Sequence, residues 1–328
     1  MIGPVLTKVL QHAGAFDLDV VENARQLGVG PLVERLHGSS HDPRHRIACL
    51  LHHQAAKDVC AALRCDFTIL KGERLGEQLY GEARLRPTSD VDILVLPKQI
   101  ALVQTQLFSA GFRPRDTAVR LNVDNQQPWQ HPTLPVVVEL HWSIALPTCP
   151  QPPAELFVGF ANNGLPTELL FVQLLYHFHN HGGFLKGLCD LAAWWDRYAQ
   201  CADWPMVLRL AQNHGFTGLI SWTLGVLGQM SRLEPSVAPP QGVIASFAIG
   251  WTTEAMKNCL QSHGGASHEV GMKAQETPAV RVVRQLLLAQ IFDPIAPRLH
   301  ATLGPVLHRL HPPEDKSRGK SHFTMRSA

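Results

Sequence analysis

The spacing of apolar residues changes twice along this chain, and that change constrains the fold more than any other feature. Through residue 63 the apolar side chains return three or four positions apart, as Ile47, Leu50 and Leu51 do, which is typical of helices. Between residues 67 and 141 the spacing falls to two, in short β-branched runs bounded by Gly, Pro, Asp or Asn. Helical spacing returns beyond Pro153. This order predicts an α/β plus α fold class, in which a small mixed sheet with flanking helices lies between two helical regions.

The α/β unit is expected to run strand, helix, strand, helix and then a hairpin. Its predicted strands are residues 67–70, 91–96, 119–123 and 136–141, and its predicted helices are residues 73–81 and 98–110, the second ending at a Gly111 C-cap. Later helical spacing covers residues 168–181, 188–198, 204–214, 218–230 and 279–291. The predicted units are a helical segment at 1–65, the α/β core at 66–147, a helical domain at 154–311 and a flexible basic tail at 312–328.

The charge and cysteine content exclude several kinds of partner. Lys and Arg total 29 against 27 for Asp and Glu, so the net charge of +2 favours neither a long nucleic acid nor an anionic membrane. Seven cysteines form no C-x-x-C pair, which favours free thiols in a reducing compartment. The apolar runs are too short to span a bilayer, and residues 1–16 lack the apolar core of a signal peptide. We therefore expect a cytoplasmic protein with no membrane partner.

Two carboxylates stand two positions apart at the start of a predicted strand, Asp90 and Asp92. Because side chains alternate along a strand, both should point to the same face. Paired acids in an apolar strand repel each other and resist desolvation, and an oxygen-preferring divalent metal such as Mg²⁺ offsets both costs. The alternative is structural, with Asp90 capping a turn and Asp92 paired with an arginine.

A Lys-Gly pair, Lys71 and Gly72, ends the first predicted strand and leads into a helix. Glycine permits close backbone approach, the helix N-terminus offers free N–H groups, and the lysine adds a positive charge. The pattern indicates a phosphate-binding turn, although it is not a P-loop and an ordinary turn is the alternative.

A third acid, Glu139, lies in the last predicted strand and shares a face with His141. If this strand lies beside the Asp90 strand, Glu139 completes a three-carboxylate cluster suited to two metal ions. Otherwise it is an edge-strand charge that faces solvent. His141 is then expected either to support the metal ligands or to lie on the acceptor side, and not to bind the metal directly, since hard Mg²⁺ prefers oxygen.

These motifs resemble the uncharacterised nucleotidyltransferase family of the DNA polymerase β-like superfamily. The resemblance extends from Phe67 to about Ala193, and it rests on Leu70-Lys-Gly72, Leu79-Tyr80, Arg86, Asp90-Val-Asp92-Ile-Leu-Val95, Glu139-Leu-His141-Trp142, Leu174-Leu-Tyr-His177 and Leu188-Cys-Asp190-Leu-Ala192. It implies a minimal nucleotidyltransferase fold and Mg²⁺-dependent transfer of a nucleoside monophosphate from an NTP. Where the superfamily commonly has Gly-Ser before the first helix, this chain has Lys-Gly, and Glu139 stands where an aspartate is common.

In the resulting hypothesis, two Mg²⁺ ions are held by Asp90, Asp92 and Glu139. Lys71, Gly72 and Arg86 hold the triphosphate of the NTP, and attack by a hydroxyl or phosphate acceptor expels pyrophosphate. The acceptor is unidentified and could be a small molecule, a peptide, a protein or an RNA end. Two alternatives are a catalytically silent binding or antitoxin-like partner and a D-x-D sugar transferase.

A histidine-rich helix end, with His177, His179 and His181, could in principle bind a metal. Histidines also suit the C-terminus of a helix because of its dipole, and no Glu or Cys nearby completes a tetrahedral set. We favour that second interpretation, and the role of this cluster stays open at the level of sequence.

Overall fold

The structure is a computed structural model. It describes residues 2–15, 21–38, 43–88, 90–115, 124–133, 136–145, 149–161, 164–181, 184–232, 249–250 and 252–253. The predicted strand at 119–123, the predicted helix at 279–291 and the predicted tail at 312–328 lie outside these residues.

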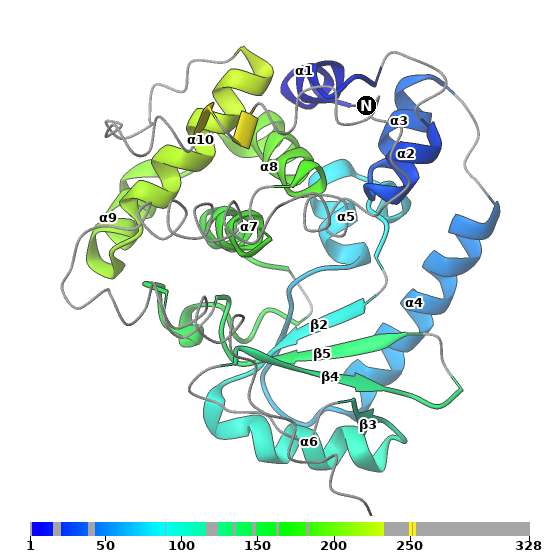
Figure 1. Ribbon diagram of the computed structural model, residues 1–328. Coiled ribbons are helices and arrows are strands. Elements are labelled where there is room, and N and C mark those ends of the chain that lie inside the picture. The colour runs from blue at the N-terminus through cyan, green and yellow to red at the C-terminus, as the bar shows by residue number, and fades with distance from the viewer. Residues whose placement is uncertain are drawn as a thin grey trace, which may run out of the picture.

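A five-stranded mixed sheet forms the centre of the α/β unit in the described part of the chain (Figure 1). Its strands are β1 (Thr68–Ile69), β2 (Asp90–Leu94), β3 (Arg113–Pro114), β4 (Gln126–Gln130) and β5 (Val137–His141), in the order β1-β2-β5-β4-β3. Strands β2 and β5 are parallel, whereas the other three pairs are antiparallel. The two strands that carry the predicted acids are therefore direct neighbours.

The sequence does not predict β4, which is the antiparallel neighbour of β5. It reads Gln-Gln-Pro-Trp-Gln, and a proline within a run argues against a strand because it has no N–H to donate. In the structure Pro128 lies opposite Glu139, and Trp129 lies opposite Val138. Trp129 is buried in the apolar cluster on one face of the sheet, which explains how so polar a strand is held in place.

The helices lie close to their predicted positions. Before the sheet come α1 (Pro4–His12), α2 (Val21–Gln26), α3 (Gly30–Leu36) and α4 (Pro43–Ala62); within the unit come α5 (Glu73–Tyr80) and α6 (Ile100–Ser109); after it come α7 (Thr167–Asn180), α8 (Leu185–Tyr198), α9 (Trp204–His214) and α10 (Thr217–Ser231). Short 3-10 turns occur at Ala83–Leu85, Pro97–Gln99 and Ala154–Leu156. Gly81, in the left-handed conformation with φ of 76°, ends α5. In the described segments, no helix is long and apolar enough to cross a lipid bilayer.

Alternation along β2 separates the two faces of the sheet. Val91 and Ile93 belong to an apolar cluster shared with α4 and α6, which cover one face (Figure 1). Asp90 and Asp92 occupy the intervening positions and therefore point to the opposite face, toward the helical part of the molecule. The pattern that predicted the strand thus also positions the acids.

The first and last helices share one apolar core. Helix α1 packs on α8 and α10, and residues of both ends of the described chain belong to a single buried cluster. The backbone N–H groups of Val5 and Leu6 donate to the Asp196 carboxylate of α8 at 2.9 and 3.0 Å. Asp196 thereby satisfies donors that have no partner within the first turn of α1. The division into four units stays a prediction.

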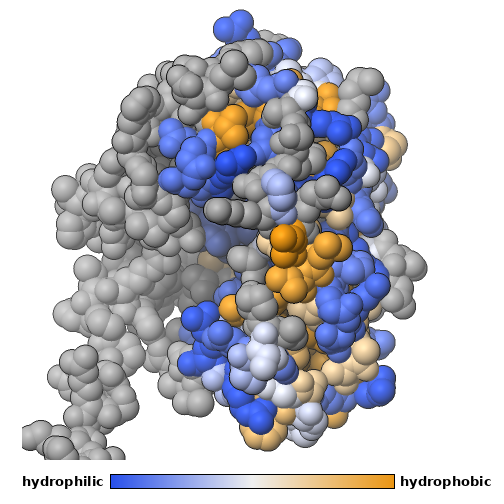
Figure 2. Space-filling view, turned by 90° about the vertical axis from the view of Figure 1, so that its right-hand side faces the viewer, coloured by the Kyte–Doolittle hydropathy of each residue, from blue (hydrophilic) through white to orange (hydrophobic). Residues whose placement is uncertain are grey.

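Helix α4 buries only the later half of its apolar stripe. Ala55 and Val59 are fully buried beside the sheet, whereas Ile47, Leu50 and Leu51 are 59%, 69% and 42% exposed. Figure 2, which views the side of the molecule on which α4 lies, shows an apolar patch in the middle of that face. The periodicity that predicted the helix therefore does not by itself identify buried residues.

Candidate functional site

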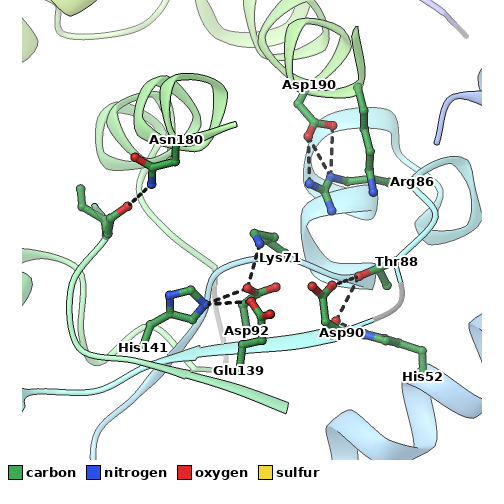
Figure 3. A network of polar contacts seen from close by, with 12 residues as sticks. His52, Lys71, Arg86, Thr88, Asp90, Asp92, Glu139, His141, Asn180 and Asp190 are labelled. Carbon is green, nitrogen blue, oxygen red and sulfur yellow. Dashed lines mark hydrogen bonds and ion pairs between the residues drawn. The ribbon is translucent and has the colours of Figure 1, made fainter. Parts of the chain in front are cut away.

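The acids of β2 and β5 meet because the two strands pair in register. Asp92 lies directly opposite Glu139, and Asp90 lies opposite Val137. Side chains at paired positions of neighbouring strands point to the same face, so the Glu139 carboxylate lies beside that of Asp92. Figure 3 shows Asp90, Asp92 and Glu139 on adjoining strands, with Lys71 above them.

Asp92 is a fully buried carboxylate with two basic neighbours, a lysine and a histidine. Lys71 Nζ lies 2.8 Å from Asp92 Oδ1, and His141 Nε2 lies 2.9 Å from the same oxygen. Burial alone would raise the pKa of Asp92, but the charge of Lys71 and the hydrogen bond from His141 hold it well below its ordinary value. Asp92 Oδ2 is buried and accepts no hydrogen bond. One oxygen of an ionised carboxylate is thus left without a donor.

Glu139 and His141 complete a cluster with Asp92. His141 Nε2 lies 3.5 Å from Glu139 Oε2, and one ligand atom from each of the three side chains lies within 4.8 Å of the others. Burial lowers the pKa of His141, but its hydrogen bonds to Asp92 and Glu139 outweigh that effect and raise the pKa above its ordinary value. Lys71 therefore supplies the positive charge beside Asp92, and His141 lies between the two carboxylates.

A hard divalent cation fits this cluster. Carboxylate oxygens are the ligands that Mg²⁺ prefers, and Asp92 Oδ2 is a buried anionic acceptor with no donor. Buried polar atoms in folded proteins are almost always paired, so an unpaired carboxylate oxygen beside a second carboxylate indicates a site suited to a cation. Among the described residues, Asp92, Glu139 and His141 form the one group of this kind.

Asp90 lies at the start of β2, two residues before Asp92, and is not part of this cluster. Thr88 Oγ1 donates to Asp90 Oδ1 at 3.1 Å and lies 3.0 Å from its backbone carbonyl oxygen. The buried His52 of α4 contacts the same carbonyl oxygen through Nε2. Asp90 is half-buried, and its carboxylate is oriented by Thr88 rather than by contact with Asp92 or Glu139.

The Lys71-Gly72 turn lies between β1 and α5, as the sequence indicates. Gly72 has φ of 87° and ψ of −154°, a backbone conformation that residues other than glycine rarely adopt. A Cβ atom at this position would stand 3.0 Å from His52 Cε1, so glycine also allows His52 to approach the turn. Lys71 points to Asp92 in this structure, and Asp92 raises its pKa against the lowering effect of burial.

Arg86 lies on the helical side of the site in a buried ion pair. Its Nε lies 3.1 and 3.0 Å from the two carboxylate oxygens of Asp190, and its Nη2 lies 2.9 Å from Asp190 Oδ2. Tyr80 donates to Asp190 Oδ1 at 2.7 Å. Arg86 Nη1 is buried and has no hydrogen-bond partner. The structure therefore brings Lys71, Asp92 and Glu139 together, while Arg86 is held by Asp190 above them (Figure 3).

The histidines at the end of α7 pack on one another. The rings of His177 and His181 lie 4.8 Å apart, and both contact Phe184. Burial, followed by the positive charge of Lys71, lowers the pKa of His177 well below its ordinary value. This imidazole is therefore neutral at pH 7, and it belongs to the electrostatic environment of the site.

Sequence reasoning missed two residues that shape the site. His52 lies 38 residues before Asp90, so no local signal could have found it. Thr88 stands two residues before Asp90, and its hydroxyl in the turn before the acidic strand was the available signal. Asp190 belonged to the resemblance, and its role as the partner of Arg86 becomes clear only from the fold.

The fold and the site together define an α/β protein with a paired-carboxylate cluster on a small mixed sheet. The model of the uncharacterised nucleotidyltransferase family matches residues 19–230, which is more than half of the 328 residues, and the chain belongs to this family. Membership supports a transferase and suggests transfer of a nucleotide. No curated protein and no solved structure matches the chain.

Proposed function

We propose that this protein transfers a nucleoside monophosphate from an NTP to a hydroxyl or phosphate acceptor, with Mg²⁺ held by Asp90, Asp92 and Glu139. The observation that carries the proposal is the buried Asp92 carboxylate, which has one oxygen without a donor and Glu139 in register beside it. Family membership supports nucleotide transfer as the reaction. A paired-carboxylate site that holds two ions is typical of phosphoryl transfer.

The bound ions would supply charge neutralisation for the phosphates and activation of the acceptor oxygen. Asp90, Asp92 and Glu139 would hold these ions, and Thr88 fixes the position of the Asp90 carboxylate. The acceptor oxygen bonds to the α-phosphorus while a hydroxyl acceptor gives up its proton to solvent water, the bond from the α-phosphorus to the α,β-bridging oxygen breaks, and pyrophosphate leaves. The rate then depends on how well these fixed groups position the two reactants.

Lys71 has two roles in this proposal. In the free protein its ammonium neutralises Asp92 Oδ1. A cation on the carboxylates would release Lys71 to contact the phosphates, next to Gly72 and the N-terminus of α5. Arg86 could reach the triphosphate through Nη1, the nitrogen that Asp190 does not engage.

The test is direct and does not require the acceptor to be known in advance. The protein is titrated with each NTP in Mg²⁺ by calorimetry, and α-labelled NTPs are then incubated with panels of small molecules, peptides, proteins and RNA. We expect Mg²⁺-dependent NTP binding, and transfer of label with release of pyrophosphate. Asp92→Asn should abolish transfer, whereas the matched variant Asp58→Asn, at an exposed position of α4, should not. NTP binding without transfer to any acceptor would favour a silent binding protein.

A further inference from the structure

The side chain of Lys186, the second residue of α8, contacts two segments that are distant from it in the sequence. Its Nζ donates to the backbone carbonyl oxygen of Pro87, in the loop that leads into β2. Its aliphatic stem passes Gly28, where a Cβ atom would stand 3.0 Å from Lys186 Cδ. Gly28 also has φ of +72°, so glycine meets both requirements there. The fold therefore directs this ammonium toward the Arg86–Asp90 loop.

The charges around Lys186 leave it without a counter-ion. Arg86 and Lys71 act on it as positive charges, and Asp190 and Asp90 act as negative ones. Asp190 is already paired with Arg86, and Asp90 accepts from Thr88. Within the described residues, no carboxylate lies at ion-pair distance from Lys186 Nζ.

We propose that Lys186 is a phosphate-binding residue of the same site, and that it contacts the phosphate tail of the nucleoside triphosphate. This inference rests on the proposed function. An ammonium has three donors, and Lys186 uses one on Pro87. Lys71 and Arg86 both act on Lys186 as positive charges, and the described residues offer Lys186 no carboxylate at ion-pair distance. A polyanion would complete this arrangement.

The protonation of Lys186 supports this assignment. Burial, followed by the positive charge of Arg86, lowers the pKa of Lys186 to about 7. The ammonium is therefore partly deprotonated in the free protein at neutral pH. A bound phosphate favours the charged form and raises that pKa, so binding of the triphosphate should take up a proton between pH 7 and the higher bound value.

Calorimetry of the full chain tests the inference, with Mg²⁺ and α,β-methylene analogues of the four NTPs as probes. Lys186→Met should weaken binding of the triphosphate about tenfold to a hundredfold, which is the range for losing a contact to a charged group. The same variant should change binding of the corresponding nucleoside by less than about threefold, since the nucleoside has no phosphate. Lys98→Met, at an exposed position, is the matched control and should leave both affinities unchanged.

A second measurement decides the matter even if Lys186→Met folds poorly. Titration of the wild type at pH 8, in two buffers of different ionisation enthalpy, should show uptake of about one proton per triphosphate. Absence of uptake would overturn the inference, as would equal losses of triphosphate and nucleoside affinity in Lys186→Met. If the wild type binds no NTP, the proposed function itself fails. If the wild type binds and Lys186→Met binds equally well, only the role of Lys186 fails.

Discussion

Two aspartates of this protein are equally buried and yet differently satisfied. Asp190 of α8 and Asp92 of β2 are both 0% exposed, and each has a basic partner. Both oxygens of Asp190 accept hydrogen bonds, from Arg86 and Tyr80, whereas Asp92 Oδ2 accepts none. A buried carboxylate that is fully satisfied holds the fold together, and one with an unpaired oxygen is suited to bind a ligand.

The two sites are connected along the chain. Arg86, held by Asp190, begins the loop that leads to Asp90 and β2. Lys186, one helical turn before Asp190 on α8, donates to Pro87 in the same loop. The satisfied ion pair thus anchors the segment that presents the unsatisfied carboxylate.

Neutralising Asp92 should have the largest effect on activity. In Asp92→Asn we expect nucleotidyl transfer to fall by at least about a thousandfold, because a neutral amide cannot replace the carboxylate as a ligand for the cation. Label transfer at saturating Mg²⁺ and NTP measures this effect. Transfer within tenfold of the wild type would show that the unpaired oxygen has no functional role.

Neutralising Asp190 should have the largest effect on stability. Asp190→Asn leaves the Arg86 guanidinium, whose side chain is 2% exposed, without a counter-charge. We expect the free energy of unfolding to fall by about 3–5 kcal/mol, as measured by urea denaturation. Asp92→Asn should cost less than half as much, since the Lys71 side chain is 14% exposed and can reach water. Equal losses in the two variants would show that the two carboxylates contribute equally to stability, contrary to this prediction.

Glu139→Gln should impair activity less than Asp92→Asn does. Glu139 is 21% exposed, and its carboxylate lies beside one that remains able to bind the cation. We expect transfer to fall about tenfold to a hundredfold, with a higher Mg²⁺ concentration required for half-maximal rate. An unchanged Mg²⁺ dependence would exclude Glu139 from the metal site. It would favour a site in which Asp90 and Asp92 alone hold the cation.

Tyr80→Phe should produce the smallest change. It removes one of the hydrogen bonds to Asp190, and Arg86 continues to pair with the carboxylate. We expect a loss of about 1–2 kcal/mol in the free energy of unfolding and normal NTP affinity. A large loss of NTP affinity would mean that the Tyr80 hydroxyl is needed to hold Asp190 and Arg86 in the position that binds the nucleotide.

The local features of this chain could be predicted from its sequence, because they depend on neighbouring residues. Period-two spacing located β2 and β5, and helical spacing located α5 within one residue of its observed end. Strand β4 was missed because Pro128 and its polar neighbours argue locally against a strand, and only the buried Trp129 and pairing with β5 offset that preference.

The amino-acid pattern alone predicts that Asp90 and Asp92 share a face and that a Lys-Gly turn precedes a helix, since alternation and turn chemistry act over a few residues. The position of Glu139 beside Asp92 follows instead from the parallel register of β2 and β5. The packing of the helices on the α/β unit likewise pairs Arg86 with Asp190, 104 residues away. Such contacts depend on how separate elements pack, and the spacing of residues within any one element does not specify them.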